Sequence, residues 1–349
     1  MTESSAQGPA PLVCPECSTQ VAPALLACPS CHRLVHATEL EGFAGQAQRA
    51  EQARDSTAAL AAWRQVLDLL PADAAQYQTV SIRIAELSRT VEKEPVTAGK
   101  GVGWTKAATG LGIIGVLLLK FKFLLIFVAT KAKLLLLGLT KASTLFSMLL
   151  SAGVYWTVWG WKFALGVVLS IYVHEMGHVQ ALQRFGIKAT APMFIPGIGA
   201  VVRMKQYPAN RREDARVGLA GPIWGVAATV AAYGIFLATR VGVWGAIAHF
   251  GAWVNLFNML PVWQLDGARG FRALTRRQRW IAVAVIGAMW LITAEGLLVL
   301  LLVAGALAAW FGDAAEQPDN TALLQYAGLV AILSLMTEIS VPTSAGGGG

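Results

Sequence analysis

Long apolar runs separated by short polar stretches dominate the second half of the chain. Each run reaches or approaches the length of about 20 residues that a helix needs to cross a bilayer. The runs are Ser143 to Trp161, Trp161 to Leu182, Val217 to Thr239, Val243 to Leu260, Trp280 to about Val303, and Leu323 to Met336. The pattern predicts a mainly α, polytopic α-helical membrane protein, with its membrane domain at residues 143–342.

Clusters of positive charge between these runs indicate their orientation, because cytosolic loops carry an excess of Lys and Arg. One cluster follows the run that ends at Leu182, and another follows the run that ends at Leu260. Both junctions should be cytosolic, as should the amino terminus, which shows no signal-peptide pattern. The acidic stretch GDAAEQPDN, residues 312–320, should then lie outside the cytosol.

The segment from Val102 to Thr140 combines dense Leu and Phe with recurring lysines. The orientation above requires an odd number of crossings between Gly101 and Trp161. A basic helix lying on the cytosolic leaflet would let the lysines reach lipid headgroups. Residues 96–142 are therefore predicted to be a linker followed by an interfacial helix, with a membrane-spanning helix as the alternative.

Polar residues dominate the amino-terminal third, where shorter amphipathic helices are expected. Leu60, Trp63 and Val66 share one face of a helix that Pro71 should stop, and a second helix follows. This helical hairpin, placed at residues 44–95, resembles part of a tetratricopeptide repeat. The sequence leaves open whether the hairpin docks a partner or only packs on itself.

All four cysteines fall in two C-P-x-C pairs within residues 1–43: Cys14 with Cys17, and Cys28 with Cys31. Each pair makes a tight turn that points two thiolates at one position, so the two pairs can complete a tetrahedral zinc site. Disulfides are the alternative, but paired C-x-x-C turns in a cytosolic segment favour metal. The segment resembles a zinc ribbon, and one structural Zn²⁺ is expected there.

Composition agrees with a membrane protein, since 55% of residues are hydrophobic and only 14% are charged. A net charge of +8 would suit nucleic acid, but the basic residues lie largely beside apolar segments, where they orient a membrane protein. No nucleic-acid partner is expected. Residues 343–349 are glycine-rich and are expected to form a flexible tail.

The stretch IYVHEMGHVQAL places ionisable residues inside an apolar run, where such groups are functional candidates. His174 and His178 are four residues apart, so both imidazoles project from one helical face, with Glu175 beside them. This arrangement chelates zinc and places a carboxylate near its bound water. The spacing predicts two zinc ligands and a general base.

A catalytic zinc site needs a third protein ligand, and the stretch NLFNMLPVWQLDG offers Asp266. Asp266 follows a helix that Pro261 should end, at the cytosolic depth predicted for the two histidines. Capping of the next helix is the alternative role for this aspartate. Asn255 and His249, on the preceding helix, are expected to be polar packing residues.

The motifs HEMGH and NMLPVWQLDG, with GLAGP between them, resemble the signatures of the site-2 protease family of intramembrane zinc metalloproteases. The resemblance covers roughly residues 163–271. It implies that His174, His178 and Asp266 bind a catalytic Zn²⁺. It also implies that Glu175 acts as general base and then as general acid.

The resemblance further implies that Asn258 hydrogen-bonds the extended substrate backbone, with helix–helix bonding as the alternative. Trp263 departs from the family pattern, which commonly has a second proline there, and this should alter the shape of the loop rather than metal ligation. The stretch APMFIPGIGAVVRM is predicted either as a hairpin that pairs with substrate or as a plain interfacial loop.

The sequence therefore predicts an intramembrane zinc metalloprotease that cleaves peptide bonds in or near transmembrane segments of membrane proteins. Its expected partners are a transmembrane protein or peptide substrate, the lipid bilayer, and a cytosolic regulator at the amino-terminal domain. The expected location is a bacterial cytoplasmic membrane, crossed several times, with the amino terminus in the cytosol. The alternative is a membrane-bound zinc-dependent sensor or scaffold without proteolytic activity, against which Glu175 argues, because a structural zinc site needs no base.

Overall fold

The computed structural model describes residues 12–22, 25–93, 142–197, 199–202, 204 and 206–339. The interfacial helix expected within residues 96–142 and the tail expected at 343–349 lie outside the described residues, apart from residue 142. The chain divides into two compact units. One holds Met1–Glu94 with Arg184–Ile187, and the other holds Pro95–Gln183 with Lys188–Gly349.

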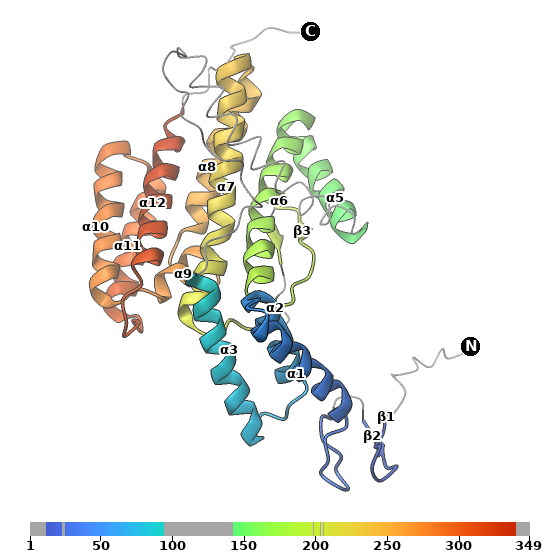
Figure 1. The fold of residues 1–349 in the computed structure, drawn as a ribbon. Coiled ribbons are helices and arrows are strands. Elements are labelled where there is room, and N and C mark those ends of the chain that lie inside the picture. The colour runs from blue at the N-terminus through green and yellow to red at the C-terminus, as the bar shows by residue number, and fades with distance from the viewer. Residues whose placement is uncertain are drawn as a thin grey trace, which may run out of the picture. The chain divides into compact units, whose positions relative to one another are not determined.

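The first unit consists of a small antiparallel hairpin followed by helices (Figure 1). Its elements are β1 (Leu12–Val13), β2 (Gln20–Val21), α1 (Ala37–Gln52), α2 (Ser56–Asp68) and α3 (Ala75–Lys93). The Asp55 side chain caps α2 by accepting a hydrogen bond from the backbone N–H of Ala58 at 2.9 Å. Helix α2 packs against both α1 and α3, so the expected helical hairpin corresponds to α2 and α3, and α1 precedes it.

Glu51 on α1 connects all three helices of this unit. Trp63 on α2 donates its indole N–H to Oε1 of Glu51 at 2.6 Å, and Arg83 on α3 donates to both carboxylate oxygens, with Nε at 3.0 Å from Oε1. The hydrogen-bonded Arg83 guanidinium holds the pKa of Glu51 below its ordinary value of 4.5.

The short segment Arg184–Ile187 is integrated into the first unit. The Nε of Arg64 donates to the carbonyl of Phe185 at 2.9 Å, and Arg184 donates to the carbonyl of Val91 at 2.8 Å. Phe185 and Ile187 are both buried. These contacts tie the segment to helices α2 and α3.

The second unit is built from helices and one short hairpin (Figure 1). Its helices are α5 (Ala142–Trp159), α6 (Trp161–Arg184), α7 (Arg211–Thr239), α8 (Gly242–Asn258), α9 (Asp266–Arg272), α10 (Arg276–Thr293), α11 (Gly296–Phe311) and α12 (Asn320–Thr337). Strands β3 (Met193–Ile195) and β4 (Gly199–Val201) pair antiparallel, with Phe194 opposite Ala200. The stretch forms a hairpin, as one of the two predictions expected, and its pairing with substrate stays a prediction.

Helix α7 runs through the centre of the second unit and packs against α8, α9 and α12. The side chain of Asn210 caps its start by accepting from the N–H of Glu213 at 2.9 Å, and Arg240 ends it in a left-handed conformation. A buried apolar cluster that includes Leu256, Met259 and Phe271 joins the carboxyl-terminal helices to α7 and α8. The cluster provides the rigid base from which α8 and α9 extend toward the site.

The predicted span from Trp280 to about Val303 is wrong, because this run forms two helices, α10 and α11, that pack against each other. Ala294 ends α10 with φ of 53°, and the Glu295 side chain then caps α11 by accepting from the N–H of Leu297 at 3.2 Å. A non-glycine residue rarely adopts this left-handed conformation, so the glycine expected at such a turn is missing at Ala294, and Gly296 two residues later begins α11.

The prediction that residues 312–320 lie on the side opposite the arginine clusters is also wrong. Asp313 pairs with Arg211 at 2.5 Å, and Asp319 pairs with Arg216 at 2.7 Å. Arg279 at the start of α10 donates to the carbonyl of Asp313 at 2.6 Å. The acidic stretch therefore lies at the same end of the unit as these arginines, because the turn at Ala294 reverses the chain.

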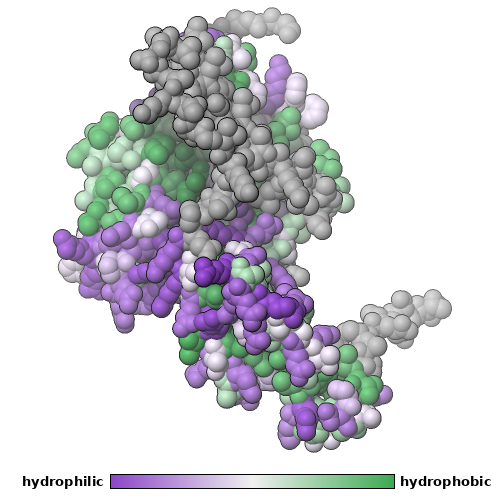
Figure 2. Space-filling view, viewed as in Figure 1, coloured by the Kyte–Doolittle hydropathy of each residue, from purple (hydrophilic) through white to green (hydrophobic). Residues whose placement is uncertain are grey.

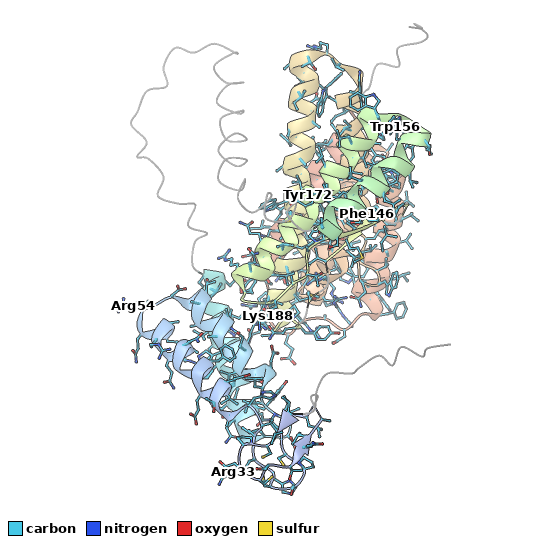
Figure 3. The ribbon with its side chains drawn as sticks, turned by 90° about the vertical axis from the view of Figure 1, so that its right-hand side faces the viewer. Arg33, Arg54, Phe146, Trp156, Tyr172 and Lys188 are labelled. Atoms are coloured by element: carbon cyan, nitrogen blue, oxygen red, sulfur yellow. The ribbon has the colours of Figure 1, made fainter. Side chains whose placement is uncertain are left out.

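Apolar side chains cover much of the outer surface of the second unit. On the face seen in Figure 2, they lie over the upper part of α10–α12, and hydrophilic residues gather at the lower end. On α5, Phe146 and Trp156 are 71% and 60% exposed, whereas Tyr172 on α6 is buried (Figure 3). Among the described residues, α7 and α12 are long and apolar enough to cross a membrane, and α11 is a shorter apolar helix.

Candidate metal centre

Helix α6 brings His174 and His178 together on its buried face. Their Nε2 atoms lie 3.2 Å apart, and both side chains are about 5% exposed. The spacing of four residues accounts for this geometry, because it places two side chains one above the other on a helix.

Asp266, the first residue of α9, approaches the two imidazoles from the other side. Its Oδ2 lies 3.0 Å from Nε2 of His174, and its Oδ1 lies 3.2 Å from Nε2 of His178. Its carboxylate thus faces the histidines, in contrast to the alternative helix-capping role. The structure brings together the three residues that the sequence analysis singled out as ligands of the catalytic zinc, and ligation itself stays a prediction.

The spacing of these donor atoms fits a tetrahedral zinc ion. Ligand atoms about 2.1 Å from such an ion lie roughly 3.4 Å apart, close to the separations of 3.0 to 3.2 Å found here. The Nδ1 of His178 lies 2.8 Å from the carbonyl oxygen of Val217, which only accepts hydrogen bonds. Nδ1 therefore carries the proton, and the lone pair of Nε2 is directed toward the centre.

Helix α7 approaches the centre through a glycine. A methyl group at Gly221 would overlap the Nε2 atoms of both His174 and His178. Gly177 on α6 lies against the backbone carbonyl of Ala220 on α7, so the two helices approach each other closely at this point. Only small residues at this crossing leave the imidazoles room to converge.

Asn255 on α8 contacts the centre, and its expected role as a packing residue is therefore incomplete. Its Oδ1 lies 2.8 Å from Nδ1 of His174, and both residues are buried. Spacing along the sequence could not reveal this contact, because it depends on how closely α8 approaches α6. The one sequence feature that could have indicated this contact is the presence of an amide side chain, Asn255, within a largely apolar helix.

A cavity of about 600 Å³ opens onto the three donor residues. Glu175 lines it and is 7% exposed, so a carboxylate that is not one of the three donors faces the same space. Asn258, the last residue of α8, lines the cavity as well, together with the residues of β4. The cavity can hold a peptide segment beside the metal centre.

The hairpin that borders this cavity is anchored on α5. The hydroxyl of Thr144 donates to the carbonyl of Pro192 at 2.8 Å, and the backbone N–H of Phe194 donates to Ser147 at 3.1 Å. These bonds involve the β3 side of the hairpin. Strand β4 therefore lies on the cavity side, with β3 as its only paired strand among the described residues.

The loop that leads to Asp266 differs in shape from one with a second proline. Trp263 has φ of 50°, whereas the ring of proline fixes φ near −65°. The backbone at this position therefore takes a path that proline cannot follow, as expected from the departure in sequence. The side chain of Trp263 is 86% exposed at the mouth of the cavity.

The four cysteines form a second cluster in the first unit. The Sγ atoms of Cys14 and Cys31 lie 3.6 Å apart, and those of Cys17 and Cys28 lie 3.5 Å apart, with no disulfide between them. Thiolates bound to one zinc ion would lie about 3.8 Å apart. The zinc-ribbon assignment is supported by this cluster.

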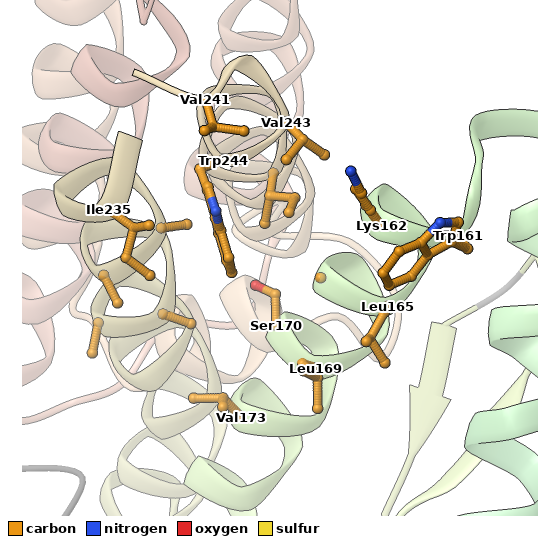
Figure 4. A pocket seen from close by; sticks show the side chains of 16 residues that line it. Trp161, Lys162, Leu165, Leu169, Ser170, Val173, Ile235, Val241, Val243 and Trp244 are labelled. Carbon is orange, nitrogen blue, oxygen red and sulfur yellow. The ribbon is translucent and has the colours of Figure 1, made fainter. Parts of the chain in front are cut away.

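A second cavity, of about 530 Å³, lies between α6, α7 and α8 (Figure 4). Its lining is largely apolar, with Ser170 on its wall and Lys162 near Trp161 at its edge. The ammonium group of Lys162 lies 5.7 Å from the centre of the Trp161 ring. Its lining includes no cluster of metal-binding side chains, so this cavity is a poor candidate for the reaction site.

Comparison with known proteins shows which family a segment of this chain resembles. Residues 162–242, which cover most of α6, the hairpin and α7, match the profile described as peptidase family M50. We refer to residues 162–242 as the M50 segment, because they are similar to this family. The resemblance to the site-2 protease family is thereby confirmed.

Three curated proteins that are similar to parts of this chain are named as zinc metalloproteases. Zinc metalloprotease MJ0392 of Methanocaldococcus jannaschii is 24% identical over 135 residues, which are 37% of this chain and 38% of that protein. Two probable chloroplastic zinc metalloproteases of Arabidopsis thaliana, EGY2 and EGY1, are 37% identical over 67 residues and 36% identical over 84 residues. These matches cover 18% and 22% of this chain.

The chain spans between 12% and 38% of the length of these relatives. The matched profile is that of a peptidase family, and these three relatives are named zinc metalloproteases. The M50 segment contains His174, Glu175 and His178, whereas Asp266 lies beyond it.

Proposed function

We propose that this protein is an intramembrane zinc metalloprotease that hydrolyses peptide bonds in or near transmembrane segments of membrane proteins. The observation that carries the proposal is the convergence of His174, His178 and Asp266 at one point of a cavity that Glu175 also lines. The proposal is further supported by the match to peptidase family M50 and by the apolar surfaces of the surrounding helices.

In this proposal the three converging residues hold Zn²⁺ through two imidazole nitrogens and one carboxylate. When bound, the ion polarises the scissile carbonyl and lowers the pKa of a water molecule toward about 7. Glu175 accepts a proton from the attacking water and passes it to the nitrogen of the leaving amine.

The substrate enters the cavity as an extended segment, because a peptide bond within a helix is shielded from attack. Strand β4 supplies backbone groups that can pair with such a segment as an added strand. The Asn258 amide at the cavity wall can hydrogen-bond the substrate backbone. Together they would hold the scissile bond beside Glu175.

We assign a second, structural zinc ion to Cys14, Cys17, Cys28 and Cys31, which complete a closed tetrahedron with no place for water. The first unit, built from this cluster and helices α1–α3, is the proposed docking site for a cytosolic regulator. The protein would cross a bacterial cytoplasmic membrane several times with its amino terminus in the cytosol. In this topology residues 312–320 would lie on the cytosolic side, which is supported by the ion pair between Asp313 and Arg211.

The test is cleavage of a panel of single-span substrates by purified protein in lipid vesicles. Glu175→Gln keeps the size of the side chain but removes the base, and we expect it to lower the cleavage rate about 100-fold to 10,000-fold. Glu316→Gln is the matched control, since Glu316 is exposed in the loop at residues 312–320, and its rate should equal that of the wild type.

Equal rates for Glu175→Gln and the wild type would refute the proposed mechanism. A wild-type protein that binds zinc at the centre but cleaves none of the substrates would instead favour the sensor or scaffold. Metal analysis of the same samples separates these outcomes from simple loss of the ion.

A further inference from the structure

We infer that Asn255 is a positioning residue that fixes the tautomer and orientation of His174 for metal binding. The inference rests on the proposed metal centre and adds to it a residue on α8. Neither histidine spacing nor the family motifs assign this role to Asn255, which lies outside the M50 segment.

The orientation of the Asn255 amide follows from its two hydrogen bonds. Its Nδ2 donates to the carbonyl of Gly251 at 2.7 Å, one turn earlier on the same helix. The oxygen must then be the atom that faces Nδ1 of His174 at 2.8 Å. Because an amide oxygen only accepts, Nδ1 of His174 carries the proton.

This assignment leaves the lone pair of Nε2 of His174 directed at Asp266. The carbonyl of Val217 produces the same tautomer at His178. The Nε2 lone pairs of His174 and His178 and the carboxylate of Asp266 therefore lie within 3.2 Å of one another. These three electron-rich groups repel one another unless a cation lies between them. By accepting from the Nδ1 atoms, the Asn255 oxygen and the Val217 carbonyl orient both imidazoles with Nε2 toward the metal position.

The space around Asn255 is shaped by helix α7. A methyl group at Gly225 would overlap the Asn255 amide, so the glycine allows α7 to press against this side chain. Asn255 is 3% exposed, and its amide lies directly against the backbone of Gly225. A buried amide held from two sides is suited to orienting a ligand, because its own position is fixed.

A packing role and a positioning role make different predictions for two substitutions. Asn255→Leu keeps the approximate volume and removes the acceptor, whereas Asn255→Asp keeps an acceptor facing Nδ1 of His174. A packing residue would tolerate leucine at least as well as aspartate. A positioning residue requires the acceptor, so only aspartate should preserve metal binding.

The experiment measures zinc affinity by chelator competition in the Glu175→Gln background, where no turnover occurs. Zinc bound to the cysteine cluster is subtracted by using a His174→Ala/His178→Ala protein. We expect Asn255→Leu to weaken binding about 10-fold to 100-fold and Asn255→Asp to stay close to the parent. His249→Leu, on the same helix but outside the cavity lining, is the control and should bind as the parent does.

Equal affinity of the Asn255→Leu protein and its parent would overturn the inference and leave the metal centre standing. Absence of zinc beyond the cysteine cluster in the parent would instead refute the proposed function. If Asn255→Leu does not fold, nitrogen NMR shifts of His174 in the metal-free parent decide the question without a substitution. A proton on Nδ1 is expected, because this nitrogen faces the Asn255 oxygen, and an Nδ1 without a proton would overturn the inference.

Discussion

At the scale of single residues, the metal centre depends on glycines that leave space as much as on the side chains that would bind the metal. His174 and His178 were predictable because helical spacing alone brings them together. Asn255 was not, because its contact depends on the distance between two helices that are far apart in sequence. Gly221 and Gly225 leave space for imidazole and amide groups, and a sequence does not indicate what an absent side chain makes room for.

Substitution of Gly221 tests this dependence. We expect Gly221→Ala to weaken zinc binding at the centre about 10-fold or more and to lower cleavage, because its methyl group overlaps both imidazoles. The matched control is Gly287→Ala on α10, where the added methyl group would lie 3.6 Å from Leu302 in ordinary contact. Bound zinc and cleavage by both proteins are the measurements, and unchanged binding in Gly221→Ala would contradict the described geometry.

At the scale of elements, most helices of the second unit follow the apolar runs of the sequence. The exception is the run divided at Ala294, where an alanine takes the left-handed position, Glu295 caps the next helix, and one glycine, Gly296, begins that helix. The hairpin of β3 and β4 was one of two open predictions, because its anchoring bonds come from Thr144 and Ser147 on a separate helix. Contacts between elements far apart in sequence therefore determine both the turn at Ala294 and the hairpin.

The link through Glu51 gives a prediction for the elements of the first unit. Because Arg83 lowers the folded-state pKa of Glu51 below 4.5, the ion pair stabilises the fold above that pH, and this contribution is lost as the pH falls through the lowered pKa. We expect Glu51→Gln to destabilise α1–α3 by about 1 kcal/mol or less at neutral pH. The difference from the wild type should disappear in acid.

Hydrogen exchange of the α1–α3 amides, followed across this pH range, measures the effect. Glu41→Gln on the same helix is the control, since Glu41 is exposed. A difference between Glu51→Gln and wild type that grows in acid would show that the ion pair is not its source.

At the scale of the whole molecule, the sequence already separated a cysteine cluster from a histidine and aspartate centre. The observed clusters contain the residues named for each, and they lie in different units of the chain. The arrangement of the carboxyl-terminal helices was predicted less well. Charge clusters indicate the side of the membrane only if each apolar run is a single helix, and the run from Trp280 to about Val303 is two helices joined by the turn at Ala294. The ion pairs of Asp313 with Arg211 and of Asp319 with Arg216 show this, because the sequence predicted that the acidic stretch and the arginines lie on opposite sides of the membrane.

The most direct test of the central claim is the zinc content of three purified proteins. We expect about two ions per chain in the wild type and about one in both Cys14→Ser/Cys17→Ser and Asp266→Asn. Asp266→Asn should lose cleavage together with its ion. A wild type with a single ion, or an Asp266→Asn protein that retains two, would contradict the account.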